Sequence, residues 1–359
     1  MLMEKDLPLE SVVKKASNKR RGVSKESKVN IILFILLVIL IFISLIIGKY
    51  YISPKVVLSS IGSKIVGQRL NVSEEIYTVI FNIRFPRVLG ALLIGAALST
   101  AGAAYQGMFK NPMVSPDILG ASSGAAFGAA LGILCSFSII GIQIVSFLFG
   151  ILAVSVTCFI SNKVSKNADT TLVLILSGML ISTLFSAFVS LIKYVADPYS
   201  KLPDITFWLM GSLSSINNKD IYIITVPIIV GIGVIMLVRW KLNIMAFGEE
   251  EAMAMGVETK KLRGIVVASS TLIIASSVSV AGLIGWVGLI IPHFSRILVG
   301  PNYKYLIPTS ILTGSSFLIL VDNLARNLAS TEIPIGILTS IIGAPFFLYL
   351  MMNIKRGWV

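Results

Sequence analysis

The chain has 359 residues, of which 55% are hydrophobic and only 13% charged, and its mean hydropathy is +0.90. Long uncharged apolar runs exclude an ordinary soluble domain and indicate a membrane protein. The net charge of +13 does not indicate a nucleic-acid partner, because the basic residues lie between apolar runs rather than on one compact face. Cys135 and Cys158 lie inside apolar runs and lack the spacing of a disulfide framework or a metal site.

The N-terminal segment differs in composition from the rest of the chain. Residues 1–29 are polar and basic, and we expect them to form a cytoplasmic tail whose Lys14–Lys28 stretch lies near anionic lipid. The uncharged run Asn30–Gly48 is long enough to span a bilayer, and no small-residue cleavage site follows it. It therefore predicts a retained membrane span, and residues 30–359 predict a single transmembrane domain.

Apolar stretches of membrane-spanning length recur along the chain and predict an all-α polytopic membrane protein with about ten transmembrane helices. The expected spans are residues 30–48, 87–107, 118–136, 140–160, 171–192, 220–238, 264–282, 283–299, 307–321 and 333–353. An even number places both termini on one side. The segments on that side carry 20 of the 30 Lys and Arg residues, so both termini are predicted to be cytoplasmic.

Four glycines recur at every fourth position of the expected third span: Gly120, Gly124, Gly128 and Gly132. In a water-soluble helix each would cost roughly 0.5–1 kcal/mol relative to alanine. In lipid, small residues let helix backbones approach closely, so the pattern predicts a helix-packing groove, with a pore-lining role as the alternative. Asp117, after Pro116, is the expected N-cap of this helix.

Ionisable residues are scarce in the expected spans, and among the acidic residues only Asp220 touches one, at its edge. This scarcity disfavours proton or sodium coupling, although backbone and hydroxyl groups can still coordinate sodium. His293 is the only histidine and cannot form a metal site by itself. The sequence contains no phosphate-binding loop and no nucleophile–base pair within the bundle, so neither an enzyme activity nor a cofactor is predicted.

Two polar features lie outside the spans. On the cytoplasmic side, Phe247–Leu262 places three glutamates first and two lysines last, which suits a short helix bracketed by Gly248 and Gly256. Its apolar residues predict a partner surface, with a solvated connector as the alternative. On the outer side, Arg84, Arg87 and Arg326 are candidates either for lipid-headgroup anchors or for docking points that receive carboxylates of a soluble partner.

Four long strings carry a resemblance to a known family. They are RFPRVLGALLIGAALSTAGAAYQGMFKNPMVSPDILGASSGAAFGA (84–129), GEEEAMAMGV (248–257), AGLIGWVGLIIPHFSRILVG (281–300) and EIPIGILTSIIGAPFFLYL (332–350). They occur in order and at family-like spacing from about residue 84 to the end of the chain. With them the chain resembles the permease subunits of ATP-binding-cassette (ABC) importers for iron–siderophore, haem and cobalamin.

The resemblance implies a multi-pass protein of the cell membrane that itself performs no chemistry. Two permease subunits, identical or paralogous, would pair around the substrate path, and cytoplasmic ATPase subunits would hydrolyse ATP. An extracytoplasmic substrate-binding protein would dock on Arg84, Arg87 and Arg326. Thr170 and Thr171 would belong to the cytoplasmic gate, although the neighbouring Asp169 departs from the family pattern. The ATPase coupling helix, about residues 248–257, would use Gly248, Glu249, Glu250, Ala252, Met253, Met255 and Gly256.

Two other functions remain open on the sequence. An ion-coupled secondary transporter would move its solute without an ATPase, and a membrane scaffold or sensor would move no solute. Among importer substrates, the resemblance favours an iron–siderophore complex, with haem and cobalamin as alternatives.

Overall fold

The computed structural model describes residues 24–66, 73–165 and 170–353, and throughout these residues the regular structure is helical. The basic tail of residues 1–23 and Asp169 lie outside the described residues. The elements in chain order are α2 (Lys25–Ile46), α3 (Pro54–Val66), α4 (Glu74–Thr78), the π-helical turn η1 (Val79–Arg84), α5 (Phe85–Met108), the 3-10 turn η2 (Pro116–Leu119), α6 (Ala121–Leu134), α7 (Ile139–Val164), α8 (Thr170–Val195), α9 (Lys201–Leu209), α10 (Asn218–Met245), α11 (Glu249–Ala254), α12 (Thr259–Ala281), α13 (Val287–Val299), α14 (Tyr303–Asn327) and α15 (Ile335–Asn353).

These helices confirm the predicted all-α polytopic fold. Eight of the described helical segments are long and apolar enough to cross a membrane, and α6 and α13 are shorter apolar helices. Each of the ten expected spans coincides with one of these segments. The structural helices extend further than expected at several ends; α2, for example, begins at Lys25 and α14 continues to Asn327.

Helices α6 and α13 are too short to cross a bilayer alone. Their 14 and 13 residues measure about 21 and 20 Å at 1.5 Å per residue, against a hydrocarbon core of about 30 Å. Segments that are not α-helical precede both helices: residues 109–120, which include the 3-10 turn η2, before α6, and residues 282–286 before α13. Irregular backbone is tolerated at membrane depth only where protein covers it. Pro116 meets this condition, because it is buried against Gly288 at the start of α13.

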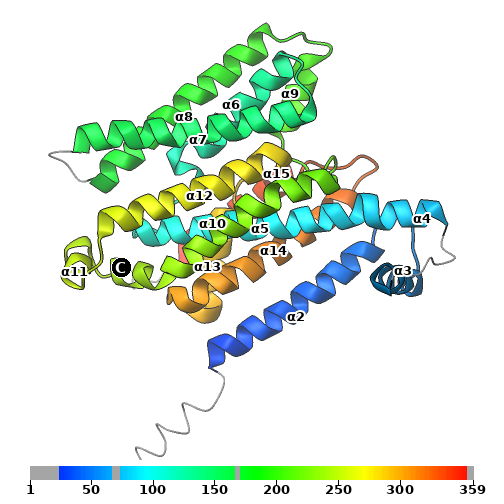
Figure 1. Cartoon of the computed structure of the whole chain (residues 1–359), viewed down its shortest axis with the longest axis horizontal. Coiled ribbons are helices and arrows are strands. Elements are labelled where there is room, and N and C mark those ends of the chain that lie inside the picture. The colour runs from blue at the N-terminus through cyan, green and yellow to red at the C-terminus, as the bar shows by residue number, and fades with distance from the viewer. Residues whose placement is uncertain (1–23, 67–72, 166–169, 354–359) are drawn as a thin grey trace, which may run out of the picture.

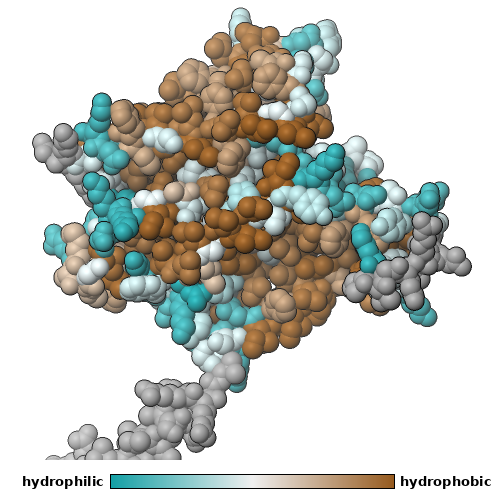
Figure 2. All heavy atoms as spheres, in the orientation of Figure 1, coloured by the Kyte–Doolittle hydropathy of each residue, from teal (hydrophilic) through white to brown (hydrophobic). Residues whose placement is uncertain are grey.

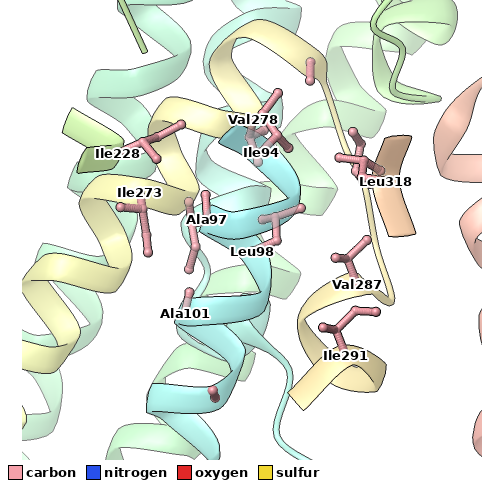
Figure 3. Packing of buried hydrophobic residues seen from close by; sticks show 14 of the residues in the cluster. Ile94, Ala97, Leu98, Ala101, Ile228, Ile273, Val278, Val287, Ile291 and Leu318 are labelled. Atoms are coloured by element: carbon pink, nitrogen blue, oxygen red, sulfur yellow. The ribbon is translucent and has the colours of Figure 1, made fainter. Parts of the chain in front are cut away.

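Helix α5 is the centre of the bundle. It packs against α10, α12, α13 and α14, and nearly all of its residues from Ile94 onwards are buried. Two glycines permit the closest approaches: a Cβ on Gly95 would overlap the backbone of Gly314, and one on Gly102 would overlap that of Gly288. Figure 3 shows the surrounding apolar contacts, made by Ile94, Ala97, Leu98, Ala101, Ile228, Ile273, Val278, Val287, Ile291 and Leu318.

The glycine series of the third span serves two purposes. Gly124, Gly128 and Gly132 face α7, where an added Cβ on the first two would collide with the Phe149 and Val145 carbonyls. Gly120, in contrast, lies outside the helix: α6 begins at Ala121, and Gly120 is its N-cap with φ of +89°. Only glycine adopts that conformation without strain.

The expected N-cap role of Asp117 is therefore wrong. Asp117 lies in η2, and Ser115 is the N-cap of that turn. The Asp117 carboxylate instead accepts hydrogen bonds from the hydroxyls of Ser122 and Ser115. It lines a small cavity of about 350 Å³, between η2, α6, α8 and the segment before α13.

The arrangement in space agrees with the predicted topology. In Figure 1, α2 begins and the described chain ends on the side where α11 lies, and α3 and α4 lie at the opposite end. Helices α6, α7, α8 and α9 form a group above α12 in this view, and α6 and α7 pack against α12. Figure 2 shows hydrophobic residues across the middle and hydrophilic residues gathered towards these two ends, as a membrane-spanning bundle requires.

Candidate functional site

The three arginines of the predicted docking site lie at the outer end of the bundle, inside helices rather than before them. Arg84 closes the π-helical turn η1 and points towards the C-terminal end of α2. Its guanidinium donates to the carbonyls of Leu45 (2.7 Å), Ile46 (2.8 Å) and Tyr50. Helix α2 has no basic residue in its own last turn, so Arg84 supplies the cation that its C-terminus favours.

Arg87 and Arg326 share one buried carboxylate. Arg87 Nε donates to Asp322 Oδ1 at 2.7 Å, and Arg326 Nε lies 3.1 Å from Asp322 Oδ2. Arg87 Nη1 also binds both carboxylate oxygens of Glu332, at 2.8 and 3.0 Å. Arg326 Nη2 reaches back to Ser44 of α2 at 2.7 Å. These contacts join α2, α5, α14 and the segment before α15.

This set, Arg84, Arg87, Asp322, Arg326 and Glu332, is called the outer arginine network below. The arginines are only 4%, 4% and 7% exposed, so none of them presents an open guanidinium to solvent or to lipid headgroups. Glu332 is the accessible member, with 38% of its side chain exposed. A soluble partner would therefore meet Glu332 before it met Arg87.

Sequence reasoning missed Asp322 and the role of Glu332. Asp322 lies one residue beyond the expected end of the ninth span, but α14 continues for another turn and buries it to 1% exposure. A usable signal was present: Asp322 and Arg326 are four residues apart, which places opposite charges on one helix face.

The predicted coupling helix lies at the opposite, cytoplasmic end as α11. Gly248 (φ +152°) precedes it and Gly256 (φ +79°) follows it, both in conformations that favour glycine. Ala252 is fully buried and anchors the helix to the bundle. Met253 and Met255 are 54% and 53% exposed, beside the exposed Glu250. Two large apolar side chains outside the expected lipid region form a surface suited to a protein partner.

Arg263 connects α11 to two spans. It lies on α12, and its Nη2 donates to both carboxylate oxygens of Glu249, at 2.9 and 3.1 Å. The same nitrogen lies 3.2 Å from Thr171 Oγ1, in the first turn of α8. We call Glu249–Arg263–Thr171 the inner tether. It brings a predicted gate residue and a predicted coupling-helix residue to one guanidinium, which sequence reasoning did not foresee. Thr170 lies next to it and is half-buried.

Two observations concern chemistry within the bundle. His293 lies buried on α13, and within the described residues no group of three or more His, Cys, Asp or Glu side chains is placed to hold a metal ion.

Gln106 of α5 accepts a hydrogen bond from Arg296 and donates to the Leu289 carbonyl at 3.2 Å, so these polar groups hold α5 against α13.

Comparisons with known proteins agree with this architecture. The model of the FecCD transport family matches residues 36–353. The molybdate import system permease protein MolB of Haemophilus influenzae is 42% identical over 90% of this chain and 95% of its own length. The cobalamin import system permease protein BtuC of Halobacterium salinarum is 39% identical over 79% and 76%. A probable iron chelatin transport system permease protein of Helicobacter pylori is 38% identical over 77% and 83%.

A solved structure extends the comparison to three dimensions. It is described as an inward-facing conformation of a metal-chelate type ABC transporter. The two chains share 41% identity with a TM-score of 0.82, over 91% of this chain and 99% of the other. The fold and the two polar ends thus define a multi-pass permease of an ABC importer in the cell membrane. The chain belongs to the FecCD transport family.

Proposed function

We propose that this permease carries an iron–siderophore complex into the cytoplasm, with haem, cobalamin and molybdate as alternatives. An external binding protein delivers the substrate, and separate cytoplasmic ATPase subunits supply the energy. A second permease subunit completes the path. Relatives named for iron chelatin, hemin, cobalamin and molybdate support this substrate range. Molybdate was not anticipated from the sequence, and the strength of that relationship adds it to the substrates to be tested.

The observation that carries the proposal is the form of α11. It presents Met253 and Met255 outward and is fixed inward by Ala252 and by the inner tether. A partner that moves α11 would therefore pull on α12 and on the start of α8 together. Such a connection is what an ATP-driven permease requires, because closure of the ATPase must change the cytoplasmic opening.

At the outer end, we propose that binding-protein carboxylates reach Arg87 by taking the place of Glu332. Arg87 binds Glu332 through two oxygens at the edge of the network, while Asp322 holds its Nε from within. Exchange of one carboxylate for another keeps the buried guanidinium paired throughout. The desolvation penalty of an unpaired buried charge is thereby avoided.

The decisive experiment measures ATPase assembly on the full-length permease in lipid nanodiscs. The double variant Met253→Ser/Met255→Ser removes apolar area from α11, and we expect ATPase affinity to fall more than about tenfold, since burying each side chain contributes about 1.5–3 kcal/mol. The matched control is Met113→Ser, which changes another exposed methionine in a connection of the same predicted side. Equal ATPase binding by all three proteins would overturn the assignment of α11.

Sealed proteoliposomes separate the importer from an ion-coupled transporter, because they enclose a compartment into which substrate can move. Uptake by the importer stops without ATP and ATPase and continues with an uncoupler, whereas an ion-coupled transporter behaves in the opposite way. Substrate identity follows from the cognate binding protein, titrated in turn with ferric siderophore, haem, cobalamin and molybdate. Tightest binding of the siderophore supports the first choice, and tightest binding of another ligand replaces it.

A further inference from the structure

A crevice of about 950 Å³ opens between α7, α8 and α12. On α7 its lining extends from Ile151 to Ser165, which corresponds to about 21 Å of helix, and it ends at the cytoplasmic ends of the three helices. This inner crevice therefore covers the depth of one bilayer leaflet, whose hydrocarbon half is about 15 Å thick.

The lining changes character with depth. Towards the middle of the membrane it consists mainly of apolar side chains, among them Ile151, Val154, Val267 and Leu272. Towards the cytoplasm it is polar and is formed by Asn162, Ser165, Thr170, Glu249, Lys260 and Arg263. An apolar half and a polar half in this order match the order of acyl chain and headgroup in the inner leaflet.

The polar half carries a net positive charge. Among the described residues it contains two cations, Lys260 and Arg263, against the single carboxylate of Glu249. Arg263 is 8% exposed, and its Nε is a buried donor that has no hydrogen-bond partner among the described residues. That nitrogen is closed to solvent, so an anion in the crevice meets the exposed Lys260 directly, and Arg263 adds a second positive charge at close range.

Small residues keep the crevice open along α12. Gly264 and Ala268 both line it and are both exposed. A Cβ added at Gly264 would find nothing within 4 Å, in contrast to the crowded glycines of α5 and α6. Within the described part of this chain, Gly264 therefore does not bring two helix backbones into close contact. Its missing side chain leaves free volume beside Arg263.

We propose that the inner crevice binds one anionic phospholipid. The phosphate lies at Lys260, beside Arg263, and one acyl chain lies along Ile151, Val154 and Leu272. The lipid thereby becomes a neighbour of the inner tether. The proposal depends only on the membrane orientation and on the crevice, so it stands whether or not the importer assignment does.

The test is native mass spectrometry of the full-length permease after equilibration with equal amounts of dioleoylphosphatidylglycerol and dioleoylphosphatidylcholine. We expect the wild type to retain one phosphatidylglycerol per chain. Gly264→Leu fills the crevice and should lose this lipid. Lys260→Gln should lower the preference for phosphatidylglycerol over phosphatidylcholine several-fold, because it removes one of the two cations.

The matched control is Gly233→Leu, on α10. Gly233 is also an exposed helical glycine with nothing within 4 Å of an added Cβ, but it does not line the crevice. Retention of the lipid by Gly233→Leu and its loss from Gly264→Leu support the site. Equal retention by both variants, equal binding of the two lipids by the wild type, or displacement by inorganic phosphate alone would each overturn it. Thermal unfolding of each variant checks that the bundle is intact.

Discussion

Asp322 is the residue on which the outer arginine network depends. It is 1% exposed and lies between Arg87 and Arg326. Its single negative charge therefore neutralises only part of the positive charge of the two buried guanidinium groups. Glu332 supplies the second negative charge from the protein surface. Removal of one member of a buried charge pair is strongly destabilising, whereas removal of the accessible member is far less so. The two acidic residues therefore permit different experiments.

Glu332→Gln should strengthen docking of the binding protein. The variant withdraws a carboxylate that competes for Arg87 and leaves two cations against Asp322, so an incoming carboxylate meets less competition. We expect about three- to tenfold tighter binding in nanodiscs, corresponding to about 0.6–1.4 kcal/mol.

Glu75→Gln is the control for this measurement. Glu75 lies exposed on α4 and takes part in none of the ion pairs among the described residues. Its substitution should leave the affinity unchanged. Unchanged or weaker docking in Glu332→Gln would contradict the proposed exchange of carboxylates, and Arg87 would then be a structural residue only.

At the scale of single residues, the sequence predicted positions better than environments. The topology built from hydropathy and loop charge placed Arg84, Arg87 and Arg326 at one face of the membrane, and the structure gathers them at one end of the bundle. Their burial was not predictable, because it depends on Asp322 and Ser44, which come from helices far apart in the chain. In the same way, nothing in the sequence around Arg263 predicts its contact with Thr171, which is 92 residues away.

Among the elements, α11 and its attachment deserve a direct test of coupling. Arg263 joins α11, α12 and α8 through one side chain. Its bond to Glu249 is partly exposed, since 41% of the Glu249 side chain is accessible, so the pair contributes less to stability than to position. We therefore expect the inner tether to transmit movement rather than to hold the bundle together.

Arg263→Gln should separate ATP hydrolysis from transport. We expect ATPase subunits to bind and to hydrolyse ATP, while uptake per ATP falls roughly tenfold, the effect of losing about 1.4 kcal/mol of interaction between α11 and α8. Lys261→Gln, the exposed neighbour on α12, provides the control for lost charge. Parallel loss of hydrolysis and uptake would instead indicate that Arg263 is needed for assembly.

The contact between α6 and α7 makes a second prediction about elements. Gly124→Ala places a methyl group against the Phe149 carbonyl and the Ala153 side chain, so we expect a loss of about 1–3 kcal/mol in the free energy of unfolding. Gly233→Ala, which has open space around it, should gain about 0.5–1 kcal/mol from its lower backbone entropy. Denaturation in detergent micelles measures both changes, and equal stability of the two variants would contradict close packing at Gly124.

Helix boundaries show what periodicity can and cannot predict. The four-residue glycine spacing predicted a helix-packing groove, and Gly124, Gly128 and Gly132 lie against α7, but the spacing did not reveal that the helix begins only at Ala121. The left-handed conformation of Gly120 depends on how η2 packs beside α8, which is a tertiary property. Hydropathy likewise located all ten spans, although it could not distinguish full crossings from the short helices α6 and α13.

For the whole molecule, the charge bias predicts that the α6–α7 connection faces outward. Cys135 lies at the start of this connection and is exposed, whereas Cys158 lies half-buried within α7. In a Cys158→Ser variant, a membrane-impermeant maleimide added to intact cells should label Cys135. Labelling only after the membrane is permeabilised would invert the topology and would move the outer arginine network to the cytoplasm.

The attachment of α2 has a consequence for how the protein is made. Its polar contacts join it to α14: Thr309 bonds to Asn30, and Ser44 bonds to Asn323, each across 279 residues of sequence. The ribosome delivers α2 first and α14 near the end. The first span must therefore wait in lipid, with its serine and asparagine unmatched, until nearly the whole chain has been inserted. A chain truncated before α14 should hold α2 only through Arg84 and the neighbouring early helices, so that the Asn30 and Ser44 side chains stay unmatched, and we expect membrane quality-control proteases to recognise it.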